Sequence, residues 1–214
     1  MSNILDYLDW RGDLAIDRRA PFCEVDNLIL TQLSFIDLAG IADGDRLRRS
    51  VTLREAAARY LADPKAHAGR LGVLIPNEVA GLLEKAAASR RFGDMRLLRF
   101  ENTIDETLQT QFAALCIVVG DGSFYISFRG TDDTLVGWKE NFNMGFMDRV
   151  PAQLLAARYT EAAARAIRGK IRIGGHSKGG NLSLYAASHL PRRLQKRVIA
   201  VYNNDGPGFG KSIT

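Results

Sequence analysis

Histidine and cysteine are scarce in this sequence. Three of the 214 residues are histidines and two are cysteines. Cys23 and Cys116 lie far apart and show no metal-ligand spacing, so the sequence predicts neither a metal site nor a cofactor. The interpretation that fits best is two reduced thiols in a cytoplasmic protein, with a single disulfide as the alternative.

Long apolar runs are also missing. No stretch approaches the ~20 consecutive apolar residues of a membrane-spanning helix. The opening residues, MSNILDYLDWRGD, lack the basic segment and apolar core of a signal peptide, so we expect no export signal. The basic residues that give the formal net charge of +5 are scattered and not interleaved with aromatic residues. The sequence therefore predicts no transmembrane segment and no nucleic-acid partner.

The composition is that of a folded domain. With 46% hydrophobic and 25% charged residues, the chain can bury one sizeable core, and no linker divides it. We therefore expect a single domain over residues 1–214. Its first part, residues 1–93, places apolar residues at three- and four-residue spacings, which predict helices at 3–10, 24–40, 52–63 and 76–89.

The pattern changes in residues 94–214, where short apolar segments appear. These segments predict strands at 96–104, 112–120, 124–130, 170–175 and 197–205. A long amphipathic helix is expected at 151–169, and the series from there on alternates strand and helix, which predicts parallel pairing. The expected fold class is therefore α/β, with a mostly parallel sheet flanked by helices and a helical N-terminal region.

One strand-to-helix corner has the sequence GGHSKGG, which places Ser177 between Gly175 and Gly179. A nucleophilic serine on a sharp turn needs neighbours without side chains, and the two glycines meet that need. The carboxyl end of a central strand is also where open α/β sheets place their chemistry. The alternatives are a glycine-rich turn with a capping serine and a phosphate-binding loop, although the G-K-[ST] ending of such a loop is missing.

A serine nucleophile also needs N–H donors for the oxyanion that forms during acyl transfer. The backbone N–H of Lys178 is one candidate. Thr131, which follows the strand that ends at 128, would supply the second from a loop at the same end of the sheet. The alternative for Thr131 is a polar turn residue, and Asp132 and Asp133 are expected to cap the next helix.

Several segments carry a family resemblance. The sequence FRGT, followed by Trp138 and then by GGHSKGGNLSLYAA, resembles the class 3 (fungal-type) lipases of the α/β-hydrolase fold. NILDYLDWRGDL, PFCEVDNLILTQLSFIDLAG and VYNNDGPGFGK are more similar to a bacterial lipase-like family of unknown function. The resemblance implies acyl-ester hydrolysis, with Ser177 as the nucleophile and Thr131 and Lys178 in the oxyanion hole. Lys178 replaces a leucine of the lipases, which argues against a purely apolar acyl site.

The general base is the missing component, because none of the three histidines is well placed. His176 belongs to the corner itself, where its side chain is expected beside the turn. His189 is expected at the far end of the next helix, ~18 Å along it, and His67 falls in a loop of the helical region. The usual chain order in this fold is serine, acid and then histidine. We therefore expect the base to follow residue 214, in C-terminal strands that this chain lacks.

Asp205 is the candidate acid, because it ends the strand at 197–205 and so reaches the same edge of the sheet as Ser177. Its alternative is a turn or capping residue. Two functions stay open at this point. The first is a serine hydrolase of carboxylic esters, lipid esters among them, for which this chain alone is expected to be inactive. The second is a non-catalytic lipase-like module that binds an acyl ligand or a protein. Missing strands would leave an unpaired sheet edge, so self-association is also expected.

Overall fold

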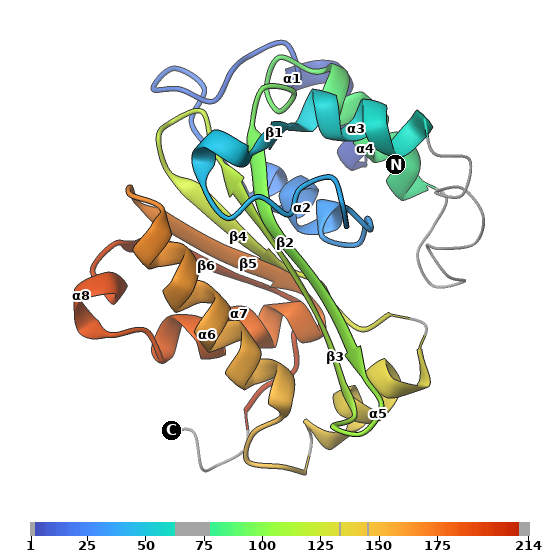
Figure 1. Ribbon diagram of the computed structural model, residues 1–214. Helices are drawn as coiled ribbons and strands as arrows, with labels where there is room; N and C mark the ends of the chain where they lie inside the picture. Colours follow the sequence, from blue (N-terminus) through green and yellow to red (C-terminus); the bar gives the residue numbers. More distant parts are fainter. Residues whose placement is uncertain (1–2, 63–77, 133, 145, 210–214) are drawn as a thin grey trace.

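The computed structural model describes residues 3–62, 78–132, 134–144 and 146–209, and contains one six-stranded sheet with helices on both faces (Figure 1). The strands lie in the sheet in chain order. They are β1 (Val51–Thr52), β2 (Arg96–Asp105), β3 (Thr110–Val118), β4 (Phe124–Phe128), β5 (Ile171–His176) and β6 (Val198–Asn204). The α/β class and the positions of the five predicted strands are confirmed, and β1 is an additional short strand.

The expectation of a mostly parallel sheet is wrong, because the sheet is mixed. The pairings β1–β2, β2–β3 and β3–β4 are antiparallel, whereas β4–β5 and β5–β6 are parallel. The reason lies in the connections. Short turns join β2 to β3 and β3 to β4, and a parallel crossover needs a dozen or more residues. Helices α3 and α4 also lie between β1 and β2, which are nevertheless antiparallel. The alternation of strand and helix produces parallel neighbours only after β4.

Four helices of the N-terminal region cover one face of the sheet (Figure 1). They are α1 (Ile4–Arg11), α2 (Glu24–Leu33), α3 (Leu53–Ala62) and α4 (Glu78–Ala88), and a short 3₁₀ helix covers Leu47–Arg49. α2 ends earlier than its apolar spacing predicts, since the Ser34 hydroxyl donates to the Thr31 carbonyl (2.8 Å) and the chain turns there. The first two residues expected for the helix at 76–89 lie outside the described residues.

The other face is covered by α6 (Pro151–Ala166) and α7 (Lys178–Ser188), with the short α8 (Arg192–Gln195) beside them (Figure 1). α6 begins at its proline, as predicted, and Ala156 and Ala163 pack on the sheet where Phe112 and Phe128 are buried. α5 (Leu135–Asn143) lies apart from them, next to β3. It is capped by Thr134, whose hydroxyl accepts from the Gly137 N–H (3.0 Å).

Both cysteines are free thiols. Cys116 is buried in β3, and burial raises the pKa of its thiol to about 12, so the thiol stays protonated and unreactive at neutral pH. Of the helices within the described ranges, none combines the length and the apolar character needed to cross a bilayer.

Candidate active site

Ser177 lies where β5 turns into α7, and its backbone is strained. It is the N-cap residue of α7 and has φ 54° and ψ −126°, a region that favours glycine. The turn is fixed on both sides. The Ser177 N–H donates to the Asn204 carbonyl of β6 (2.9 Å), and the Ser177 carbonyl accepts from the Gly180 N–H (2.9 Å). The sheet and the helix together hold the serine in this conformation.

Gly175 and Gly179 allow three backbone segments to meet at this turn. A Cβ atom on Gly179 would lie 2.2 Å from the carbonyl oxygen of Phe128, at the end of β4. A Cβ atom on Gly175 would lie 2.4 Å from the backbone of Gly179. Neither position has room for a side chain, so the close approach of β4, β5 and α7 depends on both glycines.

The loop after β4 lies directly against the serine. A Cβ atom on Gly130 would lie 3.5 Å from the Cβ of Ser177 and 2.7 Å from the carbonyl oxygen of His176. The next residue is Thr131, whose hydroxyl is buried and has no hydrogen-bond partner within the described part of the chain. The loop is braced by Arg129, which donates to Asn102 (2.6 Å) and pairs with Asp132 (3.7 Å).

Asp132, which is the acidic residue of this loop that the structure describes, supports the N-terminal cap of α5. One carboxylate oxygen of Asp132 accepts from the N–H (3.0 Å) and the hydroxyl (2.5 Å) of Thr134, and Thr134 in turn caps the helix. Asp132 therefore acts through the capping residue instead of capping α5 itself. Asp133 lies outside the described residues.

The two backbone segments expected to form an oxyanion hole therefore meet at Ser177. Lys178 is the first residue of α7, where a backbone N–H has no acceptor within the helix. The N-terminus of a helix also carries a partial positive charge, which favours an anion at this position. The loop with Gly130 and Thr131 approaches from the other side.

The side chain of Lys178 lies inside the protein and not in the space beside Ser177. It is fully buried, and its ammonium donates to the carbonyl oxygen of Gln111 (2.5 Å), to the side-chain oxygen of Gln111 (2.6 Å) and to Glu140 (2.9 Å). These contacts use all three of its donors. Burial lowers the pKa of Lys178, and its attraction to Glu140 works against that shift. The expectation that Lys178 makes the acyl site less apolar is therefore wrong.

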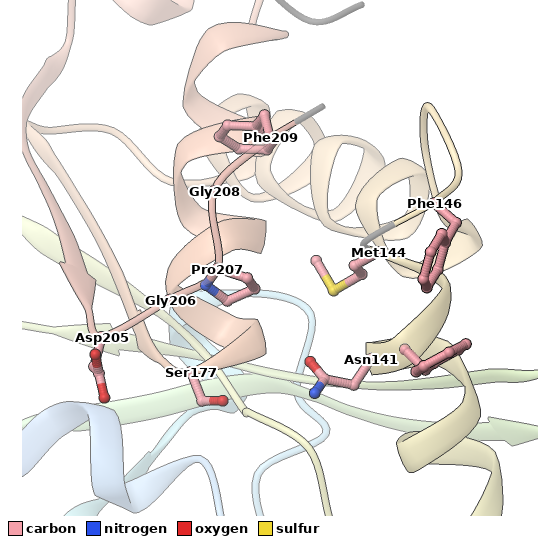
Figure 2. A pocket seen from close by; sticks show the side chains of 10 residues that line it. Asn141, Met144, Phe146, Ser177, Asp205, Gly206, Pro207, Gly208 and Phe209 are labelled. Atoms are coloured by element: carbon pink, nitrogen blue, oxygen red, sulfur yellow. The ribbon is translucent and has the colours of Figure 1, made fainter. Parts of the chain in front are cut away.

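An open hollow of about 720 Å³ begins at Ser177 (Figure 2). α5 and the residues that follow it form one wall, and the segment after β6 forms the other. In Figure 2 the hydroxyl of Ser177 points toward Asn141 on α5. Most of the side chains around it are apolar. The lining residues are Asn141, Phe142, Met144, Phe146, Ser177, Asp205, Gly206, Pro207, Gly208 and Phe209.

Asp205 reaches the same hollow from the end of β6. It has φ 56° and is exposed, and it lies at the end of the strand that pairs with β5. Figure 2 shows its carboxylate on the side away from the hydroxyl of Ser177. The structure thus brings Asp205 and Ser177 to one edge of the sheet, where both line the same hollow.

Neither histidine in the described ranges is hydrogen-bonded to Ser177. His176 is exposed at the end of β5. His189 caps the far end of α7, where its ring stacks on Tyr185 and its Nδ1 contacts the Tyr185 carbonyl (2.8 Å). His67 falls outside the described residues. Within those residues, no group of histidine, cysteine and acidic side chains is arranged to hold a metal ion.

α5 and the residues just beyond it form a wall of the hollow that the sequence patterns did not identify. Its large apolar side chains at Leu135, Trp138 and Phe142 are exposed, as is Phe146 just beyond it, while Glu140 is buried. The three- and four-residue spacing of Leu135, Trp138 and Phe142 is a helical signal that could have identified the element. No pattern in the neighbouring sequence indicates that Glu140, on the polar side of this helix, is buried.

One comparison with known proteins found a match, and it covers the part of the chain that contains this site. The model of the Mbeg1-like family, a lipase-like family of unknown function, matches residues 86–214. The matched range contains β2 to β6, the turn at Ser177 and both walls of the hollow. No curated protein and no solved structure matches the chain.

Proposed function

We propose that this chain, which belongs to the Mbeg1-like family, carries the nucleophile of a serine hydrolase that acts on carboxylic esters, and that its sheet is an α/β-hydrolase sheet. The observation that carries the proposal is the strained backbone of Ser177, with φ 54°, in a turn where two glycines leave no room for side chains. Such strain costs stability, and its benefit is to hold a hydroxyl clear of the sheet.

The proposed reaction is acyl transfer to Ser177. Its Oγ attacks the acyl carbon, and the serine proton passes to a histidine base outside the described residues. The backbone N–H groups of Lys178 and Thr131 stabilise the oxyanion, and the buried, unpartnered hydroxyl of Thr131 can add a third hydrogen bond. The base then protonates the departing alkoxide, and water hydrolyses the acyl-enzyme.

Asp205 is assigned the role of orienting that histidine. The position of Asp205 at the end of β6, where it lines the same hollow as Ser177, supports this assignment, because the acid of a catalytic triad orients the histidine that contacts the nucleophile. Removing the acid should then reduce the reactivity of Ser177 only when the complete base is present.

The acyl group is proposed to be lipid-derived. Phe142, Met144 and Phe146 form one wall of the hollow and Pro207 and Phe209 lie on the other. Such a surface gains free energy by covering a hydrocarbon chain. The buried position of the Lys178 side chain supports this choice of substrate, since none of the described residues that line the hollow is then positively charged.

The second candidate is a non-catalytic module that binds an acyl ligand or a partner protein in the same hollow. It is favoured by one observation, which is that neither of the described histidines contacts Ser177. The two free thiols fit a reducing compartment, so we propose a cytoplasmic location for either function. Self-association through β6 is also proposed.

The two candidates differ in the reaction of Ser177 with a fluorophosphonate probe. Because neither described histidine is hydrogen-bonded to Ser177, we expect no labelling of the folded 214-residue chain alone and labelling at Ser177 after addition of imidazole, which can serve as an external base. Mass spectrometry locates the modified residue, and the Ser177→Ala chain should stay unlabelled. Absence of labelling with imidazole in a folded sample, together with binding of a fluorescent fatty acid, would favour the binding module.

A further inference from the structure

α5 shows an inverted distribution of side chains. A surface helix usually buries its apolar side and exposes its charged side. Within Leu135–Asn143, the buried residues are Gly137 and Glu140, while Leu135, Trp138 and Phe142 are exposed. Apart from Met144, the C-cap residue, which is buried in the core, burial of apolar surface therefore contributes little to the attachment of this helix. The carboxylate of Glu140 is the group that connects it to the interior.

Glu140 is a junction between four segments of the fold. One carboxylate oxygen accepts from Lys178 (2.9 Å) and from the backbone N–H of Gln111 in β3 (3.0 Å). The other oxygen accepts from the N–H of Ala152, in the first turn of α6 (3.0 Å). Lys178 and Glu140 are both fully buried, so the pair is not weakened by solvent. Residues 110–111, α5, α6 and the serine turn thus meet at one ion pair.

The opposite wall of the hollow is fastened to the same turn of α7. Asn181, which follows Lys178 by less than one helical turn, donates to the carbonyl oxygens of Pro207 (3.0 Å) and Gly208 (3.2 Å). Its own side-chain oxygen accepts from Gln153 of α6 (2.8 Å). The first turn of α7 therefore presents the nucleophile and holds both walls, one through Lys178 and the other through Asn181.

We propose that Lys178 is a positioning residue that fixes α5 as a wall of the hollow through its buried pair with Glu140, and thereby sets the preference of Ser177 for long acyl chains. The part of this inference that concerns acyl chains rests on the proposed hydrolase function, and the part that concerns α5 does not. A short acyl group needs only the turn and the oxyanion donors. A long chain also needs Phe142 and Met144 in place.

The first measurement is amide hydrogen exchange, which requires no catalysis. In the Lys178→Met/Glu140→Gln double variant, which leaves no buried unpaired charge, exchange within α5 should accelerate about 10-fold or more. Exchange in β5 and in α6 beyond its first turn should stay unchanged, whereas the Ala152 N–H, which donates to Glu140, is expected to respond with α5. Lys139→Met, which removes an exposed lysine of the same helix, should leave α5 unchanged. If the double variant does not fold, Glu140→Gln alone, which keeps an acceptor for Lys178, replaces it.

Two exchange results would overturn the inference. One is unchanged protection of α5 in the folded double variant. The other is an equal acceleration in every segment, because that would show a general loss of stability instead of a released wall.

The second measurement compares imidazole-assisted labelling of Ser177 by ethyl and decyl fluorophosphonates. In the double variant the preference for the decyl probe should fall about 10-fold, with the change in the inhibition constant and not in the limiting rate. An unchanged preference would overturn the role in chain selection. If the original chain is not labelled by either probe, the hydrolase proposal fails, and the exchange result still decides whether Lys178 holds α5.

Discussion

At the scale of single residues, the backbone conformation of Ser177 is expected to lower the stability of the fold. Its φ of 54° is strained for serine and unstrained for glycine. Relief of about 1–3 kcal/mol of strain exceeds the about 0.4–1 kcal/mol that glycine costs through the unfolded chain. We therefore expect Ser177→Gly to be about 1 kcal/mol more stable than Ser177→Ala in urea unfolding, although both variants lack the serine hydroxyl. Equal stabilities would show that the turn is not strained.

One ion pair is expected to make the stability of the fold depend on pH. Asp121 pairs with Arg172 (2.9 Å) at the turn between β3 and β4. Desolvation favours a higher pKa for Asp121, but hydrogen bonds from Ser123 and Arg172 outweigh it and hold this pKa below its ordinary value of 3.8. The pair therefore stabilises the folded state above pH 3.8, and that contribution disappears as the pH falls through the lower, folded-state pKa.

Asp121→Asn should accordingly lower the free energy of unfolding by about 1 kcal/mol at neutral pH. The difference should shrink as the pH falls below 3.8 and vanish once the carboxyl group of folded Asp121 is protonated, because both proteins then carry a neutral group at this position. Asp9→Asn is a suitable control, since its pair with Lys85 is exposed and should change stability by less than about 0.5 kcal/mol. A difference that persists in acid would point to packing rather than charge.

At the scale of elements, the approach of α7 to β4 depends on Gly179. A methyl group there would collide with the Phe128 carbonyl oxygen, so Gly179→Ala should destabilise the fold by more than about 2 kcal/mol. Gly81→Ala is the matched control, because nothing lies within 4 Å of its position on α4. This control should gain about 1 kcal/mol from helix propensity. Thermal unfolding of both variants tests the comparison, and similar losses would contradict it.

Elements are also the scale at which the sequence was most informative. Apolar periodicity located the strands and most helices, because burial acts on each short segment through its own pattern. The strand directions in the first half of the sheet depend on turn lengths, which the sequence also contains. The position of the Lys178 side chain could not be predicted, since it is determined by Gln111 and Glu140, which are distant in the chain. The roles of Ser177, Thr131 and Asp205 stay predictions.

At the scale of the whole molecule, β6 offers a surface for self-association. Within the described residues it pairs with β5 alone, and Ile199 on it is 47% exposed. An unpaired edge strand with apolar side chains can pair with the edge strand of another molecule, and a charged side chain on the strand opposes this pairing. We expect light scattering after size exclusion to show concentration-dependent association that Ile199→Lys abolishes. Leu108→Lys, at an exposed turn elsewhere, should leave association intact. A concentration-independent monomer would rule out this contact.

The mixed sheet also implies an order of folding. Turns of four and five residues join β2, β3 and β4, whereas residues 129–170 separate β4 from β5. Short loops close at a lower entropic cost, so the hairpins form early and the parallel strands join later. Pulsed hydrogen exchange during refolding should protect β3 before β5, and simultaneous protection would contradict this order. Ser177 lies just beyond β5, so a chain that stops folding midway would have formed its hairpins but not the strained turn at Ser177.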